Sequence, residues 1–183
     1  MDPRNPISRR KALAALGYSL SIPAASVALD FHDQVKFKAK TLDGQNLSNE
    51  SVQGKVVLVQ FWATWCPYCR SDAPAVDALQ REFRDRLVVL AVDVGESKRT
   101  VTQYLARSPR ECKIVLMTDT NLAAWFGPKS YPHYALIGRD GREAGEQKGA
   151  GGERSLRRLL HKAGLQPEDV DGPDDLQSSP RRD

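Results

Sequence analysis

The chain has 183 residues, of which 40% are hydrophobic and 27% are charged, and its formal net charge is +4. This length fits one domain of about 100 to 200 residues with additional tails, and it is enough to bury a core without disulfide staples. Four of the 27 basic residues but only one of the 23 acids lie in residues 1–11, so the rest is nearly neutral. The excess of basic residues therefore gives no reason to expect a nucleic-acid partner.

The first 28 residues are predicted to be an export signal or an N-terminal membrane anchor. A basic segment, residues 1–11, precedes an uncharged and mostly apolar stretch, residues 12–29, which is the order found in secretory signals. Ser8 to Leu13 resembles a twin-arginine signal, and the small residues before Leu29 favour cleavage after Ala28. Whether the leader is cleaved or stays as an anchor, export would place the protein in the periplasm or cell envelope of a bacterium, outside the reducing cytosol.

Residues 29–165 are predicted to form one α/β domain. Runs of β-branched and other apolar residues indicate buried strands, apolar residues at helical spacing indicate helices, and Asp140-Gly141 indicates a hairpin. Strands are expected at 35–40, 46–48, 56–61, 87–94, 113–117, 134–137 and 143–147, and helices from the cysteines to Phe83 and at 98–107, 121–126 and 153–163. Pro74 is expected to kink the first helix. This order predicts a mixed sheet with helices on both faces, followed by a disordered polar tail at 166–183.

The most specific motif is the pair Cys66 and Cys69, which lies between a predicted buried strand and a predicted helix. A C-x-x-C pair is either a redox dithiol or half of a metal site. A structural zinc site needs four ligands, and the rest of the chain offers only Cys112 and isolated histidines. The sequence therefore predicts a redox dithiol, with no metal and no other cofactor.

The segment from Lys55 to Asp72, KVVLVQFWATWCPYCRSD, resembles the thioredoxin superfamily, and most closely its exported TlpA/ResA-like branch. The resemblance covers about residues 37–163 and includes Tyr131-Pro132, where the family has a cis-proline. The stretch before that proline is longer than in plain thioredoxins and has room for an extra helix and strand within residues 98–117. The resemblance implies a thioredoxin-like fold, a central mixed β-sheet flanked by helices, with a helix and a strand inserted between the active-site helix and the cis-proline.

Cys66 is predicted to be the nucleophile of the pair. It lies at the start of a helix, where the helix dipole and free backbone N–H groups favour a thiolate, and it is expected to be exposed. Cys69 lies one turn into the helix and is expected to be the less accessible thiol that resolves the mixed disulfide.

Five residues around the dithiol are predicted to bind substrate: Trp65, Pro67, Tyr68, Tyr131 and Pro132. In the family the cis-proline faces the dithiol, and the backbone of the residue before it pairs with the substrate chain, a form of strand addition. Tyr131 is bulkier than the residue usually found there, and Tyr68 has the alternative of simply facing solvent.

Asp72 is predicted to carry protons to and from Cys69. Thioredoxins place a buried Asp at the position of Gln60, which cannot titrate, whereas the TlpA/ResA-like branch commonly places a Glu at the position of Asp72. The alternative is a helix-surface Asp that interacts with the helix dipole. His133 is open to three interpretations: a group that stabilises the thiolate, a copper ligand, or a loop histidine. Cys112 is given no catalytic role, because free cysteines are often simply small buried apolar residues.

The resemblance implies a thiol–disulfide oxidoreductase that acts on proteins with cysteines or disulfides and takes electrons from a membrane or periplasmic donor. Reduction is favoured, because family members reduce apocytochrome cysteines or copper-site cysteines during oxidase assembly. Three alternatives stay open. They are a disulfide-forming oxidase, a Cu(I)-binding chaperone that uses the same cysteines, and a glutathione-dependent enzyme, which the Cys-Pro-Tyr-Cys sequence suggests.

Overall fold

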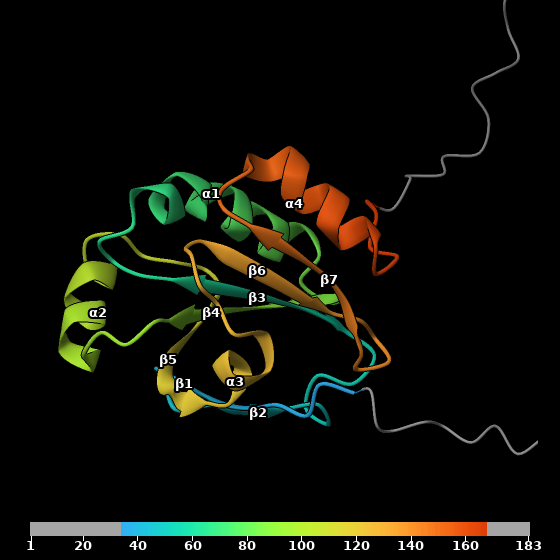
Figure 1. Ribbon diagram of the computed structural model, residues 1–183, viewed down its shortest axis with the longest axis horizontal. Coiled ribbons are helices and arrows are strands. Elements are labelled where there is room, and N and C mark those ends of the chain that lie inside the picture. Colours follow the sequence, from blue (N-terminus) through green and yellow to red (C-terminus); the bar gives the residue numbers. More distant parts are fainter. Residues whose placement is uncertain (1–33, 168–183) are drawn as a thin grey trace, which may run out of the picture. The chain divides into compact units, whose positions relative to one another are not determined.

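The computed structural model describes residues 34–167, so the predictions for the leader and for residues 168–183 lie outside the described residues. In this part of the chain seven strands form one sheet in the order β2-β1-β5-β4-β3-β6-β7 (Figure 1). The strands are β1 (Lys38–Thr41), β2 (Asn46–Ser48), β3 (Val56–Trp62), β4 (Leu87–Asp93), β5 (Lys113–Thr120), β6 (His133–Ile137) and β7 (Glu143–Lys148). The helices are α1 (Pro67–Glu82), α2 (Lys98–Leu105), α3 (Leu122–Phe126) and α4 (Gly152–His161).

The centre of the sheet is β3, which pairs parallel with β4 and antiparallel with β6. All seven of its residues are buried, because helices cover both faces of the sheet (Figure 1). Its even-numbered residues Val56, Leu58 and Trp62 pack in one apolar cluster with α1 and α4, whereas Val57, Val59 and Phe61 pack in a second cluster with α3. This alternation follows from the two-residue period of a strand. The predicted mixed sheet with helices on both faces is confirmed.

The predicted extra helix and strand are present as α2 and β5, between α1 and the proline that precedes β6. β5 pairs parallel with β4 and antiparallel with β1, so the added strand joins the β1–β2 hairpin to the central sheet. Gly44 in that hairpin has φ +92°, a left-handed conformation that glycine adopts without strain.

The start of β1 differs from the prediction for a local reason. β1 begins at Lys38 rather than Val35, because the backbone N–H of Phe37 donates to the side-chain Oδ1 of Asn49 (2.9 Å) instead of to a neighbouring strand. α1 contains Pro74 as predicted, and the helix continues past it to Glu82.

Candidate active site

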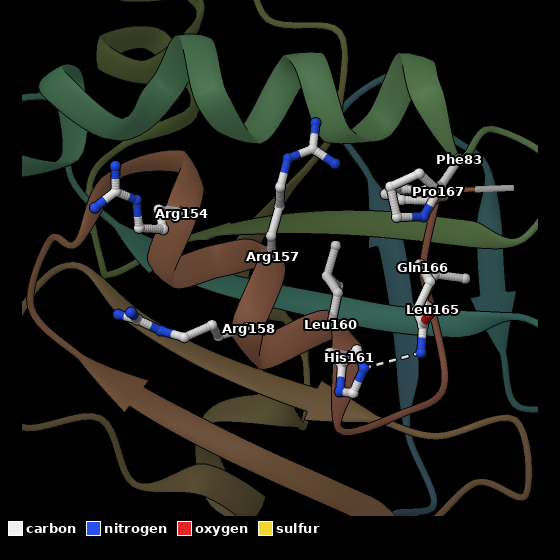
Figure 2. A pocket seen from close by; sticks show the side chains of 9 residues that line it. All are labelled: Phe83, Arg154, Arg157, Arg158, Leu160, His161, Leu165, Gln166 and Pro167. Carbon is white, nitrogen blue, oxygen red and sulfur yellow. Dashed lines mark hydrogen bonds between the residues drawn. The ribbon is translucent and has the colours of Figure 1, made fainter. Parts of the chain in front are cut away.

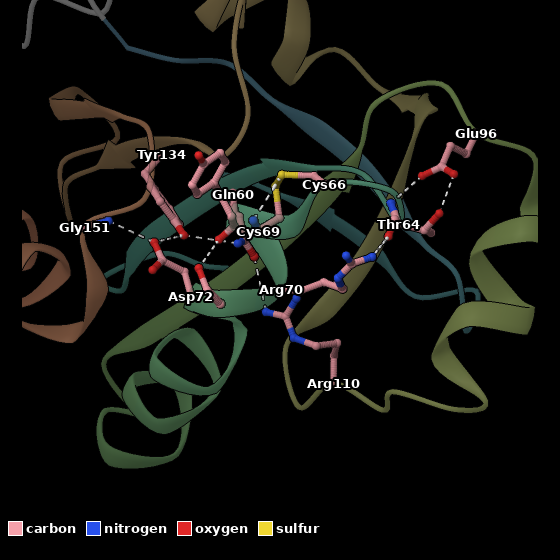
Figure 3. Close-up of a disulfide and its surroundings, with 12 residues drawn as sticks. Gln60, Thr64, Cys66, Cys69, Arg70, Asp72, Glu96, Arg110, Tyr134 and Gly151 are labelled. Carbon is pink, nitrogen blue, oxygen red and sulfur yellow. Dashed lines mark hydrogen bonds between the residues drawn. A yellow bond between two sulfur atoms is a disulfide. The ribbon is translucent and has the colours of Figure 1, made fainter.

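The two cysteines lie where β3 leads into α1, and their sulfur atoms form a disulfide. Cys66 is the N-cap of α1, and its Sγ accepts a hydrogen bond from the backbone N–H of Cys69 at 3.1 Å (Figure 3). Pro67 follows as the first helical residue, where its missing N–H would have had no intrahelical partner. The first turn of α1 has no acidic residue, so no nearby negative charge disfavours a thiolate at this end of the helix. After reduction, this helix end therefore favours the thiolate form of Cys66 over the thiol.

Both cysteines are buried in this disulfide form. Cys66 is 2% exposed and Cys69 is 1% exposed, and both pack in the apolar cluster beneath α1. The expectation that Cys66 is exposed is wrong for this state, because its sulfur turns inward to meet the N–H of Cys69. A substrate must therefore displace or pass the residues around the disulfide to reach it.

Three aromatic side chains near the disulfide, Trp65, Tyr68 and Tyr131, form what we call the aromatic rim. Trp65 is 63% exposed and Tyr68 is 66% exposed. The Trp65 ring meets the Tyr131 ring edge to face, with 6.2 Å between centroids, which brings the segment before β6 beside the loop that carries Cys66. The Tyr131–Pro132 peptide bond is cis, so the predicted cis-proline is confirmed. Exposed aromatic residues next to a reactive pair suit contact with another protein.

Acidic side chains from the end of β4 hold the loop that precedes Cys66. The Glu96 carboxylate accepts hydrogen bonds from both the backbone N–H and the hydroxyl of Thr64, each at 2.6 Å (Figure 3). The Glu96 N–H in turn donates to Oδ1 of Asp93 at 2.8 Å. Asp93 is fully buried, and burial together with the nearby Glu96 charge raises its pKa to about 7. Neither acid was found from the sequence, although Asp93 ends a buried strand at the sheet edge where sites collect.

Asp72 is buried rather than on the helix surface, so the surface alternative is wrong. It is 3% exposed and lies three residues after Cys69, on the same face of α1. Its Oδ2 accepts hydrogen bonds from the Tyr134 hydroxyl at 3.0 Å and from the Gly151 N–H at 3.2 Å, and its Oδ1 accepts from the Gly152 N–H at 3.1 Å. The carboxylate thus joins α1 to β6 and to the start of α4.

A buried polar chain continues from Tyr134 away from Asp72 (Figure 3). The Gln60 amide donates to the Tyr134 hydroxyl oxygen at 3.2 Å, and Nη2 of Arg110 donates to Oε1 of Gln60 at 3.2 Å. Nε of Arg110 donates to both carboxylate oxygens of Asp77, at 3.1 and 3.0 Å. Gln60, noted from the sequence only because it cannot titrate, is therefore a link between a buried ion pair and Asp72.

The sequence left open the roles of His133 and Cys112, of which Cys112 packs in the same apolar cluster as the dithiol. His133 is the first residue of β6 and is 1% exposed, so it is not a loop histidine. It pairs with Phe61 and contacts the ring of that residue, which places it on the α3 side of the sheet, opposite the cysteines. His133 is therefore not positioned to stabilise a Cys66 thiolate. Burial raises the pKa of the Cys112 thiol to about 12, as suits an inert core cysteine.

A pocket of about 660 Å³ lies far from the dithiol (Figure 2). It is lined by Phe83, which caps the C-terminal end of α1, and by arginines of α4 that include Arg154 and Arg158. Cys66 caps the opposite end of this helix of 16 residues, so about 24 Å of helix separates the two. Within residues 34–167, no three His, Cys, Asp or Glu side chains come together as metal ligands would. The helices in the same range are all too short or too polar to cross a membrane.

Comparison with protein families matches residues 21–160 to the Redoxin family. The thioredoxin-like protein YneN of Bacillus subtilis is 43% identical over 107 residues, a match that covers 57% of this chain and 63% of YneN. The match thus spans less than two thirds of that relative. The thiol-disulfide oxidoreductase ResA of Halalkalibacterium halodurans is 28% identical over 131 residues, which cover 71% of this chain and 74% of that protein.

Among solved structures, this chain is similar to DsbF of Mycobacterium tuberculosis (MTB), determined in mixed oxidized and reduced forms. The TM-score is 0.61 at 27% sequence identity, and the superposition covers 71% of this chain and 97% of the DsbF chain.

Proposed function

Because this chain belongs to the Redoxin family and is a thiol–disulfide oxidoreductase of the thioredoxin superfamily with a Cys66–Cys69 pair, we propose that it reduces protein disulfides in the bacterial cell envelope. Its substrates are proteins that need free cysteines for cytochrome c or copper-site maturation, and a membrane or periplasmic donor supplies its electrons. The observation that carries this proposal is the Cys66–Cys69 disulfide at the N-terminus of α1, beside an exposed aromatic rim.

The reaction begins with the reduced protein. The Cys66 thiolate attacks one sulfur of the substrate disulfide, a mixed disulfide forms, and the other substrate sulfur leaves as a thiolate. Cys69 then gives up its proton and attacks the Cys66 sulfur, which releases the second substrate sulfur. Two electrons pass to the substrate, whose thiolates take up protons, and the protein is left with its own Cys66–Cys69 disulfide. The electron donor then restores the dithiol.

Asp72 is the group proposed to take the proton from Cys69. It lies one helical turn from that cysteine and is buried with it, so a proton can pass between them without leaving the protein interior. Bulk water has little access to Cys69, which is 1% exposed, and this makes a nearby internal acceptor useful.

Substrate recognition is assigned to the aromatic rim together with Pro67 and Pro132. Large amphipathic rings supply much contact area at a small cost in side-chain entropy, which suits transient contact with many sequences. The backbone of Tyr131 is proposed to pair with an extended segment of the substrate.

The cell-envelope location is supported by the leader, residues 1–28, which we propose to be an export signal of the twin-arginine type or an N-terminal anchor. In an oxidising compartment, other proteins form disulfides, and these are the substrates that a reductant of protein disulfides needs.

Replacing Cys66 with Ser tests the proposed function in an insulin-reduction assay with dithiothreitol as electron source. We expect activity to fall to the uncatalysed rate, because serine cannot form the mixed disulfide. Cys112→Ser is the matched control, because Cys112 is a buried free cysteine, and it should keep the wild-type rate. Full activity in Cys66→Ser would contradict the assignment of Cys66 as nucleophile.

A further inference from the structure

The buried polar chain beneath the dithiol is built from four different parts of the fold. Arg110 comes from the loop between α2 and β5, Gln60 from β3, Tyr134 from β6 and Asp72 from α1 (Figure 3). Gln60 and Tyr134 are fully buried, Asp72 is 3% exposed, and the Arg110 side chain is 4% exposed. Polar groups this deep need hydrogen-bond partners inside the protein, so the geometry of the chain is strongly constrained.

The hydrogen bonds in this chain all run in one direction, from Arg110 to Asp72. A guanidinium has no acceptor, so Arg110 must donate, and it meets the carbonyl oxygen of the Gln60 amide. The Gln60 NH₂ then faces Tyr134 and donates to the hydroxyl oxygen. The hydroxyl proton is left to point at Oδ2 of Asp72, 3.0 Å from the tyrosine oxygen.

Arg110, the first donor of the chain, is held in place by its own contacts. Its Nε donates to both carboxylate oxygens of Asp77, and its guanidinium lies 6.0 Å from the ring centre of Trp62. Asp77 and Asp72 both belong to α1, so the chain begins and ends on the active-site helix.

We propose that Tyr134 is a positioning residue for the proton transfer: its hydroxyl, oriented by Gln60 and Arg110, holds the Asp72 carboxylate on the face of α1 that carries Cys69. This inference rests on the proposed role of Asp72. Tyr134 packs in the same apolar cluster as both cysteines, so it fills the space beside Asp72 on the dithiol side of the sheet. The two remaining donors to Asp72, the N–H groups of Gly151 and Gly152, come from the start of α4, a different element from the one that carries Tyr134.

The test compares Tyr134→Phe, Asp72→Asn and the double variant with the wild-type protein. The readout is the rate of insulin reduction between pH 4 and pH 9. Loss of the Tyr134 hydroxyl frees the Asp72 carboxylate to turn away from Cys69, so Tyr134→Phe should change the pH dependence of the rate. Asp72→Asn should change the pH profile at least as much, and the double variant should behave like Asp72→Asn alone.

Tyr104→Phe is the matched control, because it removes a phenol hydroxyl on α2 outside the chain. Its pH profile should match the wild type. If Tyr134→Phe does not fold, Gln60→Met breaks the preceding link and should change the pH profile in the same way. A folded Tyr134→Phe with the wild-type profile would overturn the proposal. So would an equal shift in the presence and absence of Asp72.

A second readout separates this proposal from the proposed function. The thiolate titration of the reduced protein, followed by ultraviolet absorbance, requires no substrate. Tyr134→Phe should change this titration when Asp72 is present and leave it unchanged in the Asp72→Asn background. Wild-type protein that fails to reduce insulin but shows this coupling would refute the proposed function and support the positioning role.

Discussion

Replacing Asp93 with Asn should make the protein more stable above pH 7 and leave its stability below about pH 4 nearly unchanged. Asp93 is fully buried at the end of β4, and its Oδ1 accepts the N–H of Glu96. Asparagine has the same shape as a protonated aspartic acid, keeps that oxygen as an acceptor, and offers an N–H toward the Glu96 carboxylate. The variant therefore mimics the form of Asp93 that the folded protein prefers.

The magnitude follows from the raised pKa. The Asp93 carboxyl keeps its proton to about pH 7 in the folded protein, whereas its ordinary pKa is 3.8. Between about pH 4 and pH 7 the folded state binds more protons than the unfolded state, so the free energy of unfolding falls as pH rises. The full difference corresponds to roughly 4 kcal/mol at about 1.4 kcal/mol per pH unit. Glu96 is half-exposed and partly screened by solvent, so we expect a loss of about 2 kcal/mol.

Urea unfolding of the oxidised protein at about pH 4 and about pH 8 measures this difference. The free energies of unfolding of wild type and Asp93→Asn should nearly agree at about pH 4 and differ by about 2 kcal/mol at pH 8, in favour of the variant. Asp119→Asn, at an exposed position of β5, is the control and should show no such pH dependence. A wild-type-to-Asp93→Asn difference that is the same at both pH values would refute the reasoning.

Three further outcomes test the packing and the rim. Leu79→Ala, at a fully buried position of α1, should lower the free energy of unfolding by about 3 kcal/mol in urea. Arg110→Met should lower the free energy of unfolding by about 3 kcal/mol, because it leaves the buried Asp77 carboxylate unpaired. Adding Asp77→Asn should recover part of this loss. If the double variant recovers none of it, the ion pair does not stabilise the protein. Trp65→Ala should lower kcat/KM for insulin while the rate with glutathione changes by less than about twofold, since glutathione is too small to need the rim. Equal losses for both substrates would contradict this role.

The fold and the position of the dithiol could be predicted because their determinants are local in sequence. The β-branched run of β3, the helical spacing of Val76 and Leu79, and the C-x-x-C pair between them all lie within 30 residues or so, about the length of one strand–turn–helix unit. The added α2 and β5 could be expected from the length of the chain between the cysteines and Pro132. These features depend little on where distant side chains point.

The polar surroundings of the dithiol could not be predicted, because they depend on tertiary contacts between distant residues. Arg110 follows a proline in a loop, and Tyr134 lies in an apolar strand, so neither belongs to a recognisable motif. Only the folded sheet brings them to Gln60 and Asp72. The exposure of Cys66 was misjudged because it depends on where its sulfur turns. The role of His133 stayed open because β6 begins one residue earlier than predicted and includes it.

The reduction potential of the Cys66–Cys69 pair, measured by equilibration in glutathione buffers, tests the central claim most directly. A protein that reduces disulfides needs a strongly reducing dithiol, so we predict a value near that of thioredoxin, about −270 mV. Cys112→Ser should have the same potential, because Cys112 takes no part in the exchange. A value near about −120 mV, as in a strong disulfide-forming oxidant, would contradict the proposed direction of electron flow.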